Sequence, residues 1–258
     1  MPRAHARPPA WPVPFPLAVV IAAARTVAAV TAVALFVLVC GPPVMLWSLV
    51  TRRPGPLYGA GALGVRMGFA LAGIRLRVEG AEHLRPGAVY ASNHASNIDP
   101  PAVFLALRPT FPRLRVVYKA ELRKLPVLVW AFDLAGFVPL ERGNPDQSRP
   151  AVDRAAEALA AGHSFVIFPE GTRSRTGELL PFKKGGFIMA IQAQAPVVPV
   201  AVSGSREVLK RGSMVIRPAT IRVEFAPPIP TAGLTFADRS EVVNAVRDVI
   251  ASRLASIT

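Results

Sequence analysis

The chain has 258 residues, a length that suits one large domain or one domain with an appendage. It is 52% hydrophobic and carries a net charge of +14, which points to nucleic acid, an anionic membrane surface or a phosphorylated substrate, unless the charge only reflects a chain rich in Ala, Arg and Pro. Its one cysteine, Cys40, excludes an intrachain disulfide and a metal cluster built on thiolates.

The first part of the chain differs in composition from the rest. Residues 1–16 contain six prolines and are expected to form a disordered lead-in. Residues 17–60 are expected to form a hydrophobic helical segment that associates with a membrane. No charged residue occurs from Thr26 to Thr51, and a helix of that length would cross a hydrocarbon core of roughly 30 Å.

Two geometries are open for this segment. The Gly-Pro-Pro sequence at Gly41–Pro43 should break or kink a helix. The segment would then be one kinked spanning helix or a helical hairpin that enters one leaflet, with a pair of helices buried in a soluble core as the alternative. Arg52 and Arg53 behind the run, and Trp47 near its end, suit anchors in a headgroup layer. A cleaved signal peptide fits less well, because the run is long and no small-x-small cleavage site follows it.

Residues 61–258 are expected to form one α/β domain. The sequence IRLRVEG (74–80) alternates apolar and polar residues as a half-buried strand does, and SFVIFPEG (164–171) is the continuous apolar run of a strand buried on both faces. Further strands are expected at 88–94, 114–120, 136–142, 195–204 and 220–229, and helices at 99–108, at 148–161 and from about 238. Strands that alternate with helices predict an αβ layer fold with a mostly parallel central sheet.

Helix starts are also marked in the sequence. Asp99 is expected to cap the helix at 99–108, whose two prolines then fall in the first turn, where no amide hydrogen is needed. Asp238, with Glu241 three residues on, resembles a capping box at the start of the last helix.

Three polar clusters follow predicted strands, at the edge of an α/β sheet where ligands bind. The first is NHASNIDP, which begins at Asn93. The second is Arg142, and the third is FPEGTRSRTGELLPFKKG, which follows the most hydrophobic strand. Together they predict a polar site at one edge of the sheet.

His94 and Asp99 have the spacing of a general base and its orienting carboxylate. The strand-to-helix turn between them lets Asp99 fold back to one imidazole nitrogen, which fixes the tautomer and stabilises the imidazolium after the other nitrogen has taken a proton. No G-x-S-x-G nucleophile elbow occurs, so the expected proton donor is a hydroxyl of a bound substrate that attacks directly. A histidine that packs there by accident is the alternative.

The EGTRSR sequence at 170–175 suits phosphate oxygens. It offers backbone amides next to a glycine, and the guanidinium groups of Arg173 and Arg175 can bind an anion with two parallel donors. A solvated charged loop is the alternative.

The chain resembles the glycerolipid acyltransferases, the group of the 1-acyl-glycerol-3-phosphate acyltransferases and their bacterial relatives. NHASNIDP, GFVPLERG, FPEGTRSR and VVPVAV resemble the four sequence blocks of that family, in order, between about Leu76 and Val202. The second block departs from the usual pattern, since Pro139, Leu140 and Glu141 precede Arg142. YKAELRKLP resembles the segment between the first and second blocks, and the N-terminal helical segment resembles the family's membrane-docking motif.

This resemblance implies an enzyme that moves an acyl chain from acyl-CoA or acyl carrier protein to the free hydroxyl of a lysophospholipid, most simply 1-acyl-glycerol-3-phosphate. His94 would be the base, with Asp99 orienting it, and no metal or cofactor would be needed. The implied substrate-binding residues are Lys119, Arg142 and Arg173 at the phosphate, Glu170, Gly171 and Thr172 around the acceptor, and Pro199 near the acyl chain. The implied location is the cell membrane, with the catalytic domain facing the cytoplasm.

Other functions stay open at this stage. Glycerol-3-phosphate or another lysolipid would need similar residues. A non-catalytic lipid-binding relative should have lost His94 or Asp99, and both are present. A hydrolase would use water in place of the lipid alcohol. Nucleic-acid binding is disfavoured, because three Tyr and three Trp leave few aromatic rings among the basic residues.

Overall fold

A computed structural model gives the fold, and it describes residues 15–124, 126–140 and 145–257. The helices are α1 (Phe15–Thr51), α2 (Gly55–Ala72), α3 (Asp99–Ala106), α4 (Pro126–Leu134), α5 (Pro145–Ala160), α6 (Gly185–Gln192), α7 (Ser205–Val208) and α8 (Arg239–Ile257). The strands are β1 (Arg75–Glu79), β2 (Val89–Ser92), β3 (Leu114–Lys119), β4 (Val138–Leu140), β5 (Ser164–Ile167), β6 (Val197–Ser203) and β7 (Thr220–Phe225).

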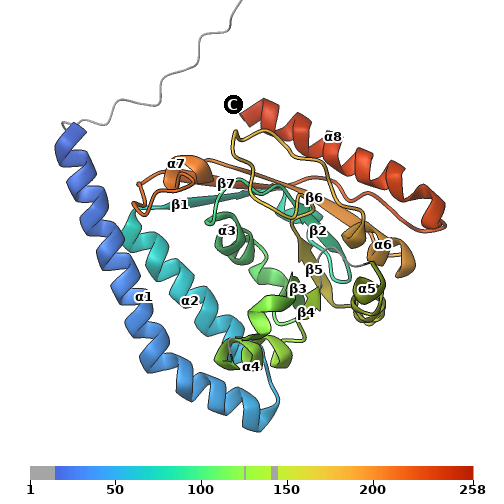
Figure 1. Cartoon of the computed structure of the whole chain (residues 1–258), viewed down its shortest axis with the longest axis horizontal. Coiled ribbons are helices and arrows are strands. Elements are labelled where there is room, and N and C mark those ends of the chain that lie inside the picture. Colours follow the sequence, from blue (N-terminus) through green and yellow to red (C-terminus); the bar gives the residue numbers. More distant parts are fainter. Residues whose placement is uncertain (1–14, 125, 141–144, 258) are drawn as a thin grey trace, which may run out of the picture.

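The strands form one sheet in the order β1-β7-β6-β2-β5-β3-β4 (Figure 1). Every neighbouring pair is parallel except β6 and β7. The five strands from β6 to β4 therefore end at the same edge of the sheet. The predicted α/β fold with a mostly parallel sheet is confirmed.

Helices cover both faces of this sheet and form a three-layer fold. On one face α5, α6 and α8 pack against the sheet, and on the other face α2 and α3 pack against it, with α1 outside α2 (Figure 1). Successive residues of one strand enter opposite cores, as the twofold period of a strand requires: Val89 and Ala91 belong to one core, and Tyr90 belongs to the other. The burial of both faces explains the continuous apolar sequence of the central strands.

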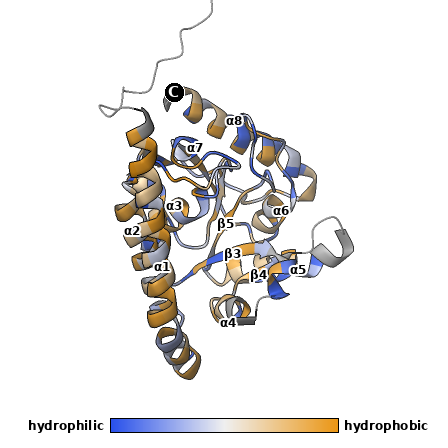
Figure 2. Ribbon diagram, turned by 60° about the vertical axis from the view of Figure 1, so that its left-hand side comes forward, coloured by the Kyte–Doolittle hydropathy of each residue, from blue (hydrophilic) through white to orange (hydrophobic). Residues whose placement is uncertain are grey.

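Helix α1 runs from Phe15 to Thr51 without a break, although Pro42 and Pro43 lie inside it. Its ribbon bends in the C-terminal part (Figure 1), so the predicted kink is seen and the predicted break is wrong. Within the described residues α1 is the one helix long and apolar enough to cross a membrane, and only 6% of its most apolar window is buried. That exposure contradicts the alternative of a buried core helix, and Figure 2 shows the apolar colour along α1 and α2.

Two predicted helix starts differ from the observed ones. The carboxylate of Asp99 makes no cap bond to helix α3; it binds amides upstream of the helix. Ahead of α8, the capping box lies three residues earlier than expected, between Thr235 and Asp238, around a short 3-10 helix.

The predicted domain boundary after residue 60 falls inside α2, which packs against both α1 and α3.

Candidate active site

The site begins where two neighbouring parallel strands end. Strand β2 leads into Asn93 and His94, and β5 leads toward Glu170, so the sheet brings both turns to one place. The side chain of Asn93 continues the pairing between β2 and β6: its Nδ2 donates to Val202 O at 2.9 Å, and its Oδ1 accepts from Val202 N at 2.7 Å. These two bonds fix the chain just before His94.

The backbone of His94 is held by the third sequence block. Its N–H donates to Glu170 Oε1 at 2.7 Å, and its carbonyl accepts from Ser174 N at 2.9 Å. The imidazole also packs on Phe168, with 4.7 Å between the ring centroids. The peptide group and the ring of His94 are therefore both positioned by residues that follow His94 by more than seventy positions in the sequence.

The imidazole of His94 meets the buried carboxylate of Asp99. Nδ1 of His94 lies 3.1 Å from Asp99 Oδ2. The same oxygen accepts the N–H groups of Ala95 at 2.6 Å and of Ser96 at 2.7 Å. A carboxylate has no hydrogen to give, so it keeps the imidazole hydrogen on Nδ1 and leaves Nε2 as the basic atom. The predicted pairing of these two side chains is therefore present in the structure.

The charge of Asp99 is compensated on one side only. Its other oxygen, Oδ1, is buried and has no hydrogen-bond donor among the described residues. A buried carboxylate in this state favours a positive charge on its neighbour. A proton taken up by Nε2 would place that charge on His94, which is the electrostatic requirement for a general base.

Glu170 joins the two turns. It is 3% exposed; Oε1 accepts from His94 N, and Oε2 accepts from Leu180 N at 3.1 Å. Burial raises the pKa of this carboxyl, and the two backbone N–H groups oppose that shift. Both oxygens therefore serve the backbone in this structure, and the predicted contact of Glu170 with a glycerol hydroxyl stays a prediction.

A polar cavity of about 290 Å³ opens beside His94. Its lining is formed by His94, Val117, Phe168, Gly171, Thr172 and Arg173. Gly171 has a φ of +67°, and a Cβ there would lie 2.9 Å from Cε and Nζ of Lys183. A side chain at this position would therefore be strained and crowded, and glycine keeps the loop close to the cavity. The volume suits a polar head group more than two whole lipids.

The other predicted site residues lie elsewhere. Lys119 ends β3 at the same sheet edge, but its side chain is not described, and Arg142 lies outside the described residues. Pro199 is buried in β6 opposite Ala91 and is not part of the cavity lining. Four of the predicted residues, His94, Gly171, Thr172 and Arg173, line the cavity together.

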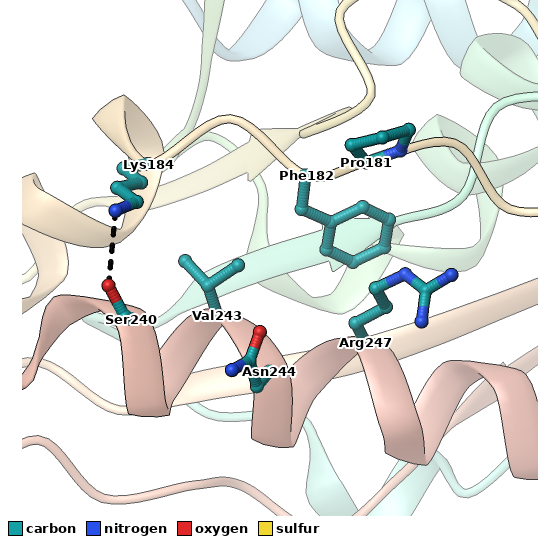
Figure 3. A pocket seen from close by; sticks show the side chains of 7 residues that line it. All are labelled: Pro181, Phe182, Lys184, Ser240, Val243, Asn244 and Arg247. Carbon is teal, nitrogen blue, oxygen red and sulfur yellow. Dashed lines mark hydrogen bonds between the residues drawn. The ribbon is translucent and has the colours of Figure 1, made fainter.

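A second hollow, of about 440 Å³, lies between α8 and the segment before α6 (Figure 3). Lys184 donates to Ser240 there at 3.1 Å, and Arg247 extends beside Phe182. Its lining contains no histidine and no carboxylate, so it offers no general base. Of these two hollows, only the His94 cavity has a histidine in its lining.

A fourth polar segment at this sheet edge was missed from the sequence. Strand β6 ends at Ser203, and Arg206 and Arg211 follow it. Arg206 donates from Nη2 to Arg175 O at 3.0 Å and from Nη1 to Thr176 O, and Arg211 Nη1 donates to Arg173 O at 3.2 Å. The sequence does contain a signal for this segment. Two arginines follow the strand predicted at 195–204, just as the three polar clusters follow their predicted strands.

Metal ligands do not gather in the described part of the chain. No three His, Cys, Asp or Glu side chains there come close enough together to hold an ion. The cavity offers a base and a cation, His94 and Arg173, in place of metal ligands. Its residues therefore suit an anionic substrate with a hydroxyl to be deprotonated.

This fold and this site define an acyltransferase, and the chain belongs to that family: residues 75–203 match the family model described as Acyltransferase. The chain is 34% identical over 209 residues to the 1-acyl-sn-glycerol-3-phosphate acyltransferase of Limnanthes douglasii. These aligned residues cover 81% of this chain and 73% of the relative. It is 34% identical over 181 residues to the human 1-acyl-sn-glycerol-3-phosphate acyltransferase alpha, with 69% of this chain and 62% of the human protein covered. These relatives confirm the resemblance seen in the four blocks.

A solved structure has the same fold. The crystal structure of PlsC from Thermotoga maritima, a 1-acyl-sn-glycerophosphate (LPA) acyltransferase, matches with a TM-score of 0.77 at 22% identity. The match covers 93% of this chain and 98% of the other. The likeness therefore includes the N-terminal helices as well as the α/β domain.

We expect Glu170→Gln to destabilise the protein. An amide has one acceptor where the carboxylate has two, so either His94 N or Leu180 N would face an NH₂ group and lose its bond. The free energy of unfolding should fall by about 1–3 kcal/mol, as measured by denaturant unfolding in detergent. Glu178→Gln, an exposed change in the same loop, should stay within about 0.5 kcal/mol of wild type. Equal stability of the two variants would contradict the bridging role of Glu170.

Proposed function

We propose that the chain transfers an acyl group from a thioester donor, acyl-CoA or acyl carrier protein, to the free hydroxyl of 1-acyl-glycerol-3-phosphate. The observation that carries the proposal is the 3.1 Å contact between His94 Nδ1 and Asp99 Oδ2 at a cavity lined by Arg173. The names of the relatives support the choice of acceptor.

His94 and Asp99 perform the proton transfer. Nε2 of His94 takes the proton of the acceptor hydroxyl as the oxygen attacks the thioester carbonyl carbon. The carbon–sulfur bond then breaks, the donor thiolate leaves with the electron pair, and the imidazolium returns the proton to it. Asp99 stabilises the imidazolium between these steps, because its charge is buried and only partly compensated.

Arg173 binds the phosphate of the acceptor. Arg173 lines the cavity with His94, and its planar guanidinium can donate two parallel hydrogen bonds to a phosphate. For Lys119, the last residue of β3, and for Arg142, the resemblance to the family implies a role at the same phosphate. Gly171 and Thr172 line the cavity beside His94, and the core around Pro199 supports the acyl chain.

The catalytic pair is tested by two substitutions. His94→Ala should lower kcat by on the order of 10²–10⁴-fold, because the base is lost. Asp99→Asn should have a smaller effect: all three donors meet Oδ2, so an amide oxygen can accept them and keep the tautomer while only the negative charge is lost. Turnover is measured with acyl-CoA and 1-acyl-glycerol-3-phosphate by mass spectrometry of the product. His83→Ala, which changes a histidine outside the site, should keep wild-type turnover.

Two results would contradict this mechanism. Wild-type turnover in His94→Ala would remove His94 as the base. A loss in Asp99→Asn as large as the loss in His94→Ala, with unchanged stability, would mean that the carboxylate does more than stabilise the imidazolium.

The phosphate contact is tested with Arg173→Lys. The lysine keeps the charge and loses the fork, so the KM for 1-acyl-glycerol-3-phosphate should rise about tenfold to a hundredfold, with the donor KM nearly unchanged. A monoacylglycerol, which lacks the phosphate, should be a poor acceptor for wild type and an equally poor one for the variant. Arg175→Lys, an exposed change in the same loop, is the control. A rise in the donor KM alone would assign this loop to the donor's phosphates.

We propose that α1 attaches the enzyme to the cell membrane, with the catalytic domain on the cytoplasmic side. Large apolar side chains stand out along α1; Leu38 is 70% exposed and Val39 is 69% exposed. Water around so many apolar groups is unfavourable, and a lipid phase removes that cost. The acceptor and the product are lipids, so attachment also brings the cavity to its substrate.

Charges on α1 test this attachment. Leu38→Glu together with Val39→Glu should abolish flotation with anionic vesicles, because an acidic side chain in the hydrocarbon core costs up to roughly 2.5–3.5 kcal/mol by the scale measured for aspartate. Phe236→Glu, at an exposed apolar residue far along the chain from α1, should float as wild type does. Flotation of the double variant at the wild-type level would show that α1 does not attach the protein to lipid.

A further inference from the structure

The loop that carries Arg173 has no regular secondary structure of its own. The residues between Gly171 and Lys184 contain neither helix nor strand. A loop of this kind samples many conformations unless other groups hold it. The phosphate contact assigned to Arg173 needs a fixed loop, and the question is which groups fix it.

The segment behind β6 contacts this loop from the neighbouring strand end. Strand β6 runs parallel to β2, so Arg206 and Arg211 come off the same sheet edge as His94. Arg206 donates its two Nη groups to the adjacent carbonyls of Arg175 and Thr176, and Arg211 donates to the carbonyl of Arg173. One planar guanidinium thus binds two successive peptide oxygens, a geometry that a lysine cannot reproduce.

The segment is itself firmly held. Val208 is fully buried and Ser205 is 1% exposed, so the short helix α7, which carries Arg206, is anchored in the core at both ends. Gly204 has a φ of +80°, and a Cβ there would lie 2.1 Å from Thr220 O, so the chain passes against β7 at this turn. Ser96 Oγ, in the turn that carries His94, donates to Leu209 O at 2.9 Å. One anchored segment therefore contacts both the loop of Arg173 and the turn of the base.

We propose that Arg206 and Arg211 are positioning residues for acyl transfer, which hold the Arg173–Gly177 loop by its carbonyls so that Arg173 meets the acceptor phosphate. This inference rests on the proposed function. Both residues lie beyond residue 203, where the match to the family model ends. The electrostatics agree with the geometry: a carbonyl oxygen repels a phosphate, and these carbonyls are engaged by guanidinium groups instead.

The kinetic test uses the full-length enzyme and two acceptors. Arg206→Ala and Arg206→Lys should each raise the KM for 1-acyl-glycerol-3-phosphate roughly three- to tenfold, and the double variant Arg206→Ala/Arg211→Ala should raise it further. The rate with a monoacylglycerol should not change, because that acceptor has no phosphate to be held. Arg217→Ala removes an exposed positive charge from the same region without a loop contact and should keep the wild-type KM.

A second measurement does not depend on catalysis. Trypsin cleaves after arginine, and Arg173 and Arg175 lie in the held loop. Cleavage at these two sites, mapped by mass, should be several times faster in Arg206→Ala/Arg211→Ala than in wild type or in Arg217→Ala. This measurement separates the inference from the proposed function. If the double variant is cleaved faster but the wild type acylates no phosphorylated acceptor, the loop contact is supported and the proposed function is rejected.

Three outcomes would contradict the inference. Unchanged cleavage and unchanged KM in the double variant would show that the two arginines do not position the loop. Equal losses with both acceptors, together with a lower melting temperature, would reduce their role to general stability. Recovery of the wild-type KM in Arg206→Lys would mean that charge, and not the fork, is what matters.

Discussion

One carboxylate oxygen, Oδ2 of Asp99, determines the geometry of the site. It accepts three donors that come from three consecutive residues, the backbone of Ala95 and Ser96 and the ring of His94. A buried negative charge needs hydrogen-bond donors, and the donors that Asp99 has among the described residues all meet this oxygen. The turn between β2 and α3 therefore closes around this atom, and the same closure fixes the ring of His94, a residue that lines the cavity. The same three hydrogen bonds therefore stabilise the turn and hold the ring of His94 in place.

The parallel sheet provides the second constraint. Because β6, β2 and β5 end at one edge, three turns from distant parts of the sequence meet there. Buried hydrogen bonds connect them: Asn93 binds β6, and Glu170 binds the backbone of His94 and of Leu180. His94 and Glu170 thus lie on loops that form hydrogen bonds with one another's backbone, as buried backbone groups require. Such a site is rigid on one side and open to a substrate on the other.

Local patterns in the sequence predicted much of this arrangement. Apolar periodicity predicted the seven strands of the described residues and the helices α3, α5 and α8, but it did not predict α4, α6 or α7. The spacing of His94 and Asp99 predicted a pair that a short turn can bring together. Partners far apart in the chain were not predictable in this way. The antiparallel placement of β7 depends on which strand it meets, the bonds of Glu170 depend on a turn seventy-six residues away, and the contact of Arg211 with Arg173 O spans thirty-eight residues. No periodicity encodes the choice of such partners.

Thr26 has a consequence for the rotation of α1 about its own axis. The helix is apolar around its whole circumference, so hydrophobicity alone prefers none of its sides. The hydroxyl of Thr26 accepts the N–H of Ile216 at 2.9 Å and donates to Ala22 O at 2.7 Å, and the small side chains of Ala22 and Ala29 are buried beside it. Any other rotational angle would leave the N–H of Ile216 without this partner. This hydroxyl therefore helps to set the rotation of a 37-residue helix, together with the packing of Val33 and Phe36 against glycines of α2.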